Sequence, residues 1–300
     1  MAIDSGSFAK LLYPGLNAIY GKDYVEYPVE YTALFDTFSS SRAYEEDIGV
    51  VGLGLAQQKP DGGAVSYDEE EQAFITRYAH SVWALGFIIT REMYEDDQYG
   101  YIGRRKASAL AFSARQTKEI VLANIYNRAF DPNYTGGDGV SLCNSAHPNW
   151  SGGTWSNIPS VAADLTEASL EQAMIDISNW TNDRGLRIAV MAKSLHIPMA
   201  LKYEAERLLM TPYRVGTADN DINTIKGMFP GGAIVNHYFT DSNAWFIRTN
   251  VKEGMKYFQR RGMEFTIDND FDTENAKFKY TERYSAGWTD PKAVYGSQGV

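Results

Sequence analysis

Residues 104–129 read RRKASALAFSARQTKEIVLANIYNRA, a stretch that contains neither Gly nor Pro. Leu110, Ala114 and Val121 recur at helical spacing and mark one face. At 1.5 Å per residue, a helix over this stretch is roughly 40 Å long. Pro132 follows, and the residue before a proline is where a helix usually stops. The sequence therefore predicts one long, uninterrupted helix.

The segment before this helix predicts a long β-hairpin over residues 48–90. Apolar residues fill the first arm, 48–56, and the return arm runs through 67–79 to the Phe-Ile-Ile run that ends at Ile89. Between the arms lies Lys-Pro-Asp-Gly-Gly at 59–63, a strong turn signal. Because a lone two-stranded ribbon is marginal in water, we expect it to lie against another chain or its own core.

The N-terminal 44 residues predict an arm with one apolar face. Phe8, Leu11, Leu12 and Leu16 follow helical spacing, but Pro14 and Gly15 interrupt the run, so we expect a short or broken helix. Residues 24–44 alternate in polarity and predict extended chain or an edge strand.

The second half of the chain predicts a mixture of helices and strands. Residues 131–160 form a loop rich in Gly, Pro, Asn and Ser. Helices are expected over 166–180 and from Pro198, a strand over 186–191, and a polar loop over 211–232. Further strands are expected at 245–248, 255–258, 265–267 and 278–284. The fold class is therefore α+β.

Composition restricts the classes of function. The chain has 300 residues and a net charge of −10, which argues against recognition of nucleic acid. No apolar run approaches the roughly 20 residues that span a bilayer, and the start lacks the pattern of a signal peptide. The single cysteine, Cys143, permits no internal disulfide and fits a reducing compartment, so a cytoplasmic site of synthesis is expected.

Residues with catalytic or metal-binding chemistry are few. Cys143 and His147 could form a nucleophile pair, and a hydrolase that uses the 138–157 loop is the corresponding alternative function. No clear third group orients this pair, and we expect no catalytic residue. The four histidines, His80, His147, His196 and His237, lack the spacing of metal ligands. We therefore expect neither a metal site nor a cofactor.

Acidic residues before the long helix have two interpretations. Glu92, Glu95, Asp96 and Asp97 could bind a hard cation. The simpler interpretation is that these carboxylates lie favourably near a helix N-terminus. Gly49, Gly52 and Gly54 precede no helix and so form no dinucleotide fingerprint.

Exposed charges are the candidate contact residues between copies of the chain. Lys59 and Asp61 lie at the predicted hairpin tip. Glu69, Glu70 and Glu71 form an acidic triplet on the return arm, and Arg104, Arg105 and Lys106 form a basic one. In an oligomer the two triplets could pair across an interface.

The order of these elements resembles the major capsid protein of tailed bacteriophages, the Hong Kong 97-type fold, in its Mu-like branch. Local phrases carry the likeness. They are Gly86-Phe87-Ile88-Ile89-Thr90-Arg91-Glu92, Asn124-Ile125-Tyr126-Asn127-Arg128-Ala129-Phe130, Asp138-Gly139, His147-Pro148, Gly152-Gly153-Thr154-Trp155-Ser156-Asn157 and His196-Ile197-Pro198. None is a catalytic motif, so the specificity lies in their order, which covers nearly the whole chain.

The resemblance implies a domain organisation. Residues 1–44 would be an N-terminal arm and residues 45–89 an extended loop over a neighbouring subunit. Residues 90–160 would form a peripheral domain around the long spine helix, residues 161–245 an axial domain whose 211–232 loop meets the capsomer centre, and residues 246–300 strands that complete the peripheral sheet. Some relatives weld subunits through a Lys–Asn bond. Lys59 suggests such a bond here, but neither an Asn partner nor a catalytic Glu can be matched.

The resemblance also implies a shell-building function without an enzymatic site. Copies would assemble as hexamers and pentamers, with scaffolding, portal and decoration proteins as partners. The shell would enclose double-stranded DNA without reading its sequence, in the virion after assembly in the host cytoplasm. An acidic wall would not adhere to that DNA. The alternative within the same fold is an encapsulin-like nanocompartment that holds an enzyme cargo.

Overall fold

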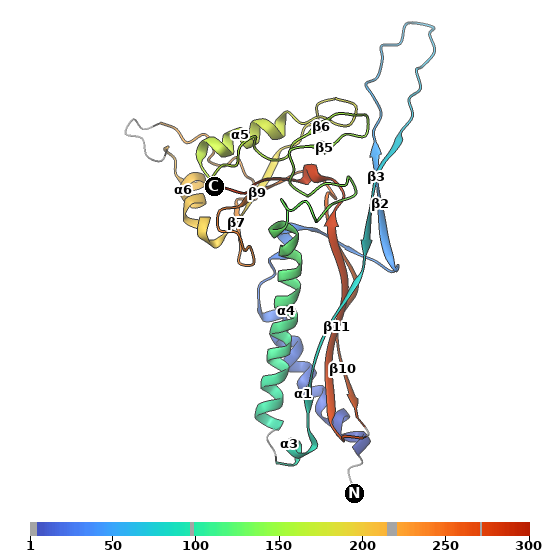
Figure 1. The fold of residues 1–300 in the computed structure, drawn as a ribbon, viewed down its shortest axis with the longest axis vertical. Coiled ribbons are helices and arrows are strands. Elements are labelled where there is room, and N and C mark those ends of the chain that lie inside the picture. Colours follow the sequence, from blue (N-terminus) through green and yellow to red (C-terminus); the bar gives the residue numbers. More distant parts are fainter. Residues whose placement is uncertain (1–4, 97–98, 215–220, 271) are drawn as a thin grey trace.

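The computed structural model describes residues 5–96, 99–214, 221–270 and 272–300 of the chain. Two four-stranded sheets lie at different levels of an elongated molecule, and a long helix, α4 (Arg104–Asn127), runs beside the lower sheet (Figure 1). The predicted long helix is thereby confirmed. A hairpin projects beyond the upper body (Figure 1).

The lower sheet has the strand order β1-β10-β11-β4. The bounds are β1 Asp36–Ser39, β4 Ser81–Ile89, β10 Met255–Asn269 and β11 Ala276–Trp288. β1 pairs in parallel with β10, and the other pairs are antiparallel. The alternation of Phe278, Tyr280 and Glu282 with exposed or half-buried residues makes one face of β11 buried.

Two helices cover that face. α1 (Ser5–Glu26) lies beside α4, and both pack on the lower sheet. Leu16 and Tyr20 of α1, Leu110 of α4 and Phe265 of β10 are buried together in one apolar cluster.

The upper sheet has the strand order β12-β9-β7-β8. The bounds are β7 Ala192–Pro198, β8 Ala233–Asn236, β9 Trp245–Thr249 and β12 Val294–Ser297. α5 (Glu167–Ser178) and α6 (Lys202–Met210) pack their apolar faces into the core of this sheet. The Thr166 hydroxyl caps α5 by accepting a bond from the Ser169 N–H, as its position before the helix predicts.

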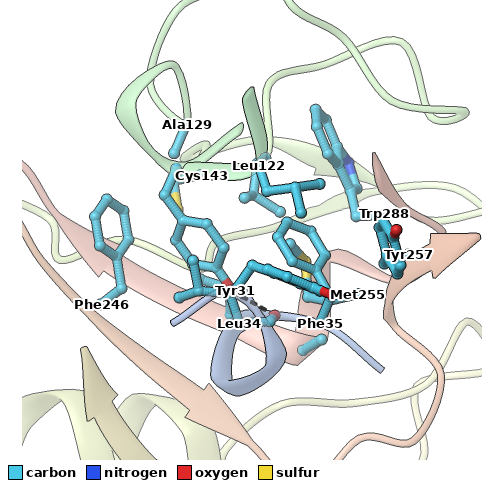
Figure 2. Close-up of a cluster of buried hydrophobic side chains, with 14 of the residues drawn as sticks. Tyr31, Leu34, Phe35, Leu122, Ala129, Cys143, Phe246, Met255, Tyr257 and Trp288 are labelled. Carbon is cyan, nitrogen blue, oxygen red and sulfur yellow. Dashed lines mark hydrogen bonds between the residues drawn. The ribbon is translucent and has the colours of Figure 1, made fainter. Parts of the chain in front are cut away.

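A third cluster joins the two levels. Figure 2 shows this cluster. It contains Cys143 together with Leu34 of α2 (Tyr31–Leu34), Leu122 of α4, Phe246 of β9 and Trp288 of β11. Since β9 belongs to the upper sheet and β11 to the lower one, the cluster fixes the sheets relative to each other.

The projecting hairpin pairs β2 (Tyr44–Val51) with β3 (Glu71–Ala79). Residues 52–70 form no strand, and the turn is closed by a bond from Gly63 N–H to the Pro60 carbonyl. Gly62 has a φ of 72°, which favours glycine. The predicted hairpin and its tip are confirmed, but the expectation that it continues to residue 90 is wrong. Residues 81–89 form β4 and pair with β11 instead.

Short elements complete the chain. They are α3 Arg91–Glu95, a π-helix Tyr99–Gly103, β5 His147–Pro148, β6 Thr154–Trp155, and 3-10 turns at Met199–Leu201 and Pro291–Ala293. In the part of the chain that the structure describes, no helix has both the length and the apolarity to cross a membrane.

Three further expectations differ from the structure. α1 continues through Pro14, which lies on an exposed side of the helix, because burial of Leu16 and Tyr20 against the sheet outweighs the lost backbone bond. The strand expected at 186–191 is β7 at 192–198, where partner strands lie on both sides. β12 pairs with β9 in the upper sheet, so the last residues do not complete the lower one.

Candidate interaction surfaces

The hairpin exposes apolar side chains where nothing of its own chain covers them. Leu53, Leu55 and Val65 are 54%, 78% and 59% exposed, and Tyr67 is 94% exposed. On the paired part, Ile48 on β2 and Ile75 on β3 are also about half exposed. An apolar surface of this kind on a protruding segment marks a contact site for another protein.

The hairpin is anchored to the body near the point where its strands end. The Arg184 guanidinium donates to Asp68 Oδ2 and to the Glu69 carbonyl, at 2.7 Å each. Asp68 also accepts the Gly54 N–H at 2.7 Å, and these hydrogen bonds hold the pKa of its carboxyl below the usual range. The rings of Phe74 and Trp150 meet edge to face at 5.4 Å. The hairpin therefore leaves the body in a defined direction.

The predicted contact residues lie at two ends of the molecule. Lys59, Asp61 and the triplet Glu69–Glu71 are exposed on the hairpin. Arg104 and Arg105 are exposed at the start of α4, and Lys106 donates to the Ile88 carbonyl at 2.9 Å. α4 starts beside α3 at the end of the molecule opposite the hairpin (Figure 1). The two triplets do not pair within one chain, and their pairing between copies stays a prediction.

A second apolar surface lies on β4, an edge strand of the lower sheet. Val82 and Ile88 share one face and are 58% and 46% exposed, and Leu85 on the opposite face is 49% exposed. Within the described residues β4 pairs with β11 only, so no strand covers its other edge. Such an edge accepts a contact from another chain.

The loop of residues 131–160 contains Cys143 and His147, the pair suggested for nucleophilic chemistry. The structure places the two side chains in different surroundings. Cys143 is buried in the joining cluster, and burial raises the pKa of its thiol. His147 is fully buried and bonds to Asp138 at 2.6 Å and to Asn157 at 3.1 Å. Both ring nitrogens of His147 are thus engaged by groups other than Cys143. Asp138 is the orienting group that sequence reasoning did not find, and it orients a structural histidine.

The Asn157 amide extends the same network. Its nitrogen donates to the carbonyls of Leu142, Val294 and, at 3.3 Å, Pro291. The network therefore ties the loop to β12 and the C-terminal segment. Its residues occur in the phrases on which the family resemblance rests, but their spacing alone does not show that they meet.

The remaining histidines, and Glu95 of the acidic residues before α4, have local partners. His80 bonds to Ser40 and Ser285, His196 to Ser194, and His237 to Glu30. Glu95 pairs with Arg91, whereas Asp97 lies outside the described residues. Among the described residues, no group of three or more potential ligands could hold a metal ion. Part of the predicted 211–232 loop, 215–220, also lies outside them.

Charged residues are buried between α4 and the lower sheet, where the sequence suggested only a helix face. Lys118 Nζ lies 2.6 Å from Glu282 Oε1, and both side chains are almost fully buried. Glu119 accepts the backbone N–H groups of Glu30 and Tyr31 at 3.2 and 3.0 Å and so fixes α2 on α4. These contacts position the elements from which the surfaces project.

Comparison with known proteins agrees with this architecture. The family model for phage capsid proteins matches residues 73–297. That range includes most of the return arm of the hairpin, α4, the upper sheet and all strands of the lower sheet except β1. A search of curated proteins found no match.

Solved structures share the fold across nearly the whole chain. The virus-like particle from Pyrococcus furiosus has a TM-score of 0.53 at 13% identity, covering 95% of this chain and 98% of that one. The procapsid of bacteriophage JBD30 has a TM-score of 0.52 at 13% identity, covering 97% and 75%. Mycobacterium phage Patience has a TM-score of 0.53 at 11% identity, covering 97% and 86%. The fold is therefore of the Hong Kong 97 type.

Proposed function

The chain belongs to the phage capsid protein family and is a structural, major capsid protein, and we propose that its copies close into an icosahedral shell of hexamers and pentamers around double-stranded DNA. The observation that carries the proposal is the hairpin. It projects from the body, exposes Leu55 and Tyr67 almost fully, and has no strand pairing over residues 52–70. Since such a segment needs a covering surface, a second copy is the natural partner.

We assign the domains accordingly. Residues 1–44 form the arm, 45–89 the extended loop, 90–160 the peripheral domain and 161–245 the axial domain. Pairing of β10 and β11 with β4 supports the return of residues 255–288 to the peripheral sheet. β9 and β12 pair within the upper sheet and are better grouped with the axial domain.

The shell is proposed to act without a catalytic centre. The buried Cys143 thiol, with its raised pKa, and the doubly bonded His147 support this over the hydrolase alternative. Location in the virion capsid follows from the family. Assembly in a host cytoplasm and contacts with scaffolding, portal and decoration proteins are parts of the same proposal.

A nanocompartment is the second candidate, and the Pyrococcus furiosus virus-like particle shares the fold at the same TM-score as a phage capsid. The family match to phage capsid proteins favours the phage shell. Particles isolated from the native source decide between them. DNA inside supports the phage shell, and a co-purifying enzyme inside supports the compartment.

Deletion of residues 56–66 tests the role of the hairpin. We expect a soluble subunit with an unchanged thermal transition, because these residues pack on no core of their own chain, but no closed shells. The measurement is sedimentation velocity with electron microscopy of the product. Normal particles from this deletion would refute the proposed role.

Charge reversal tests the predicted contact residues. Arg104→Glu with Arg105→Glu is expected to weaken assembly, because the reversed charges repel Glu69–Glu71 of a neighbour. Combining it with Glu69→Lys and Glu70→Lys is expected to restore assembly. Light scattering at low and high salt reads the effect. If the combined variant assembles no better than the Arg104→Glu, Arg105→Glu variant alone, the two triplets do not meet.

A further inference from the structure

The chain contains two Asp-Gly steps, Asp61–Gly62 and Asp138–Gly139. In both steps the glycine has a positive φ, 72° at Gly62 and 81° at Gly139. A glycine has no side chain that could shield its backbone nitrogen from the carboxyl group of the preceding aspartate. The two steps therefore share the same local chemistry, and a difference in their reactivity must come from the folded structure around them.

The Asp61–Gly62 step lies at the tip of the projecting hairpin, and both residues are exposed (Figure 1). The Gly63 N–H donates to the Pro60 carbonyl at 3.0 Å, which makes Asp61 and Gly62 the central pair of a β-turn. Among the described residues, neither the Asp61 carboxylate nor the Gly62 N–H has a hydrogen-bond partner. The carboxyl group and the neighbouring backbone nitrogen are therefore both unrestrained.

The Asp138–Gly139 step lies in the glycine-rich loop and is held at both groups. The Asp138 side chain is 7% exposed, and its Oδ2 lies 2.6 Å from His147 Nδ1. Its Oδ1 accepts the Val140 N–H at 3.3 Å, and the Gly139 N–H donates to the Gly136 carbonyl at 3.2 Å. Neither group can leave its partner unless the loop opens, and such an opening costs free energy.

We propose that Asp61 is a site of spontaneous isoaspartate formation in the folded chain and that Asp138 is protected from the same reaction. In the first step, the Gly62 nitrogen attacks Cγ of the Asp61 carboxyl group. A new C–N bond forms, the nitrogen loses its proton, and one carboxyl oxygen leaves as water. The product is a cyclic succinimide, and no oxidation or reduction takes place.

Water then opens the succinimide ring in one of two ways. Attack on the main-chain carbonyl carbon of Asp61 breaks the original peptide bond, so that the chain continues through Cβ and Cγ as isoaspartate. Attack on Cγ breaks the new C–N bond and restores aspartate. In both cases the oxygen of the added water stays in the free carboxylate, and the charge of the residue is unchanged.

The modification lengthens the backbone of the turn by one carbon atom. The hydrogen bond between Gly63 and Pro60 depends on the spacing of the two residues between them, so the modified tip cannot close the same turn. Isoaspartate at Asp61 thus changes the shape of the hairpin tip without changing its charge. The inference concerns the free folded chain and does not depend on the proposed function.

Incubation of the folded full chain in slightly acidic H₂¹⁸O measures the reaction, because each passage through the succinimide can leave one ¹⁸O atom in the carboxylate. Peptide mass spectrometry with electron-transfer fragmentation locates this atom and distinguishes isoaspartate from aspartate. Tryptophan fluorescence checks that the chain stays folded. We expect ¹⁸O and isoaspartate at Asp61. Labelling of Asp138 should be at least about 10-fold slower, which corresponds to a loop-opening free energy of about 1.4 kcal/mol or more.

The same chain in concentrated urea is the matched control, because unfolding leaves two Asp-Gly steps without the surroundings that distinguish them. Asp61 and Asp138 should then be labelled at similar rates, and both incubations are continued until the unfolded sample is labelled. Asp61→Ser removes the carboxyl group but keeps a residue that turns accept. This variant should lose the label at position 61 and keep the thermal transition of the unchanged chain.

The outcomes are distinct. Labelling of Asp61 without Asp138 in the folded chain, and of both residues in urea, would support the proposal. Equal labelling of the two residues in the folded chain would overturn the protection assigned to Asp138. An unlabelled Asp61 in the folded chain, when the unfolded chain is labelled, would show that the turn prevents the attack and would overturn the proposed site.

Discussion

The pair formed by Lys118 and Glu282 shows how a single interior contact supports the surfaces. Lys118 Nζ also lies 5.1 Å from the ring centroids of Tyr31 and Tyr257, and Glu282 accepts the Tyr280 hydroxyl at 2.8 Å. Removing one partner of a buried ion pair leaves an uncompensated charge, which typically costs about 3–5 kcal/mol. We expect Glu282→Gln to lower the free energy of unfolding by that order, measured by urea denaturation.

Glu95→Gln is the matched control for that variant. Glu95 pairs with Arg91, and both side chains are about half exposed. Exposed pairs contribute about 0–1 kcal/mol, so this variant should unfold almost as the unchanged chain does. Equal losses for the two variants would contradict the assigned difference in burial.

His196 predicts the acid sensitivity of the upper sheet. Desolvation by burial, followed by the charges of Arg248 and Lys193, lowers its pKa from 6.5 to about 3. The folded chain keeps this ring neutral, whereas the unfolded chain protonates it below pH 6.5. Its contribution to stability is therefore complete above pH 6.5 and is lost as the pH falls toward 3, by up to about 4 kcal/mol.

Replacement of this histidine isolates the effect. The slope of unfolding free energy against pH reports how many more protons the unfolded chain binds than the folded chain. Between pH 6.5 and 4, this difference should be smaller by nearly one proton in His196→Phe. The measurement is denaturant unfolding at a series of pH values. An unchanged slope would mean that another group carries the acid sensitivity.

At the scale of elements, Gly137 sets the distance between the hairpin and the body. A Cβ at this position would lie 2.4 Å from Thr76 Oγ1 and 2.8 Å from the Ile75 carbonyl oxygen. We expect Gly137→Ala to destabilise the chain by about 1–3 kcal/mol and to displace the base of the hairpin. Thermal unfolding and the rate of proteolysis within residues 52–70 report the two effects.

Gly52→Ala is the control for crowding, because nothing lies within 4 Å of a Cβ there. It should change neither the unfolding temperature nor the cleavage rate beyond the small effect of the added methyl group. Equal behaviour of both alanine variants would show that the loop and the hairpin do not contact as closely as described.

Elements with a strong local signal were predictable from the sequence. α4 has an uninterrupted periodic pattern, the hairpin has a marked turn at Pro60–Gly63, and α5 begins at a capping threonine. Elements decided by distant partners were not. The strand signal at 186–191 is as good as that of β7, but only β7 meets β8 and β9. The continuity of α1 through Pro14 likewise depends on packing that no local pattern encodes.

The candidate surfaces show the same division. Exposure of Lys59, Glu69–Glu71 and Arg104 follows from their charge, whereas the buried pair of Lys118 and Glu282 joins α4 to a strand far along the chain. His147 was recognised as a residue of possible chemistry, but its burial against Asp138 and Asn157 depends on the fold of the loop.

At the scale of the whole molecule, the parts that contain a buried apolar core are separate from the parts whose apolar side chains are uncovered. Three apolar clusters hold the two sheets and the long helix together. The hairpin tip, the outer side of β4 and the exposed face of α4 have no such cover. In such a subunit the core folds within one chain, and the exposed apolar surfaces are covered only by neighbouring copies. This arrangement suits closed assembly through many repeated contacts.

The most direct measurement is negative-stain electron microscopy of the purified full chain, paired with light scattering over a range of concentrations. The proposed function predicts closed, thin-walled shells, or rings of five and six subunits that grow into them as the concentration rises. A uniform small particle that persists at high concentration, with and without the other head proteins, would contradict it.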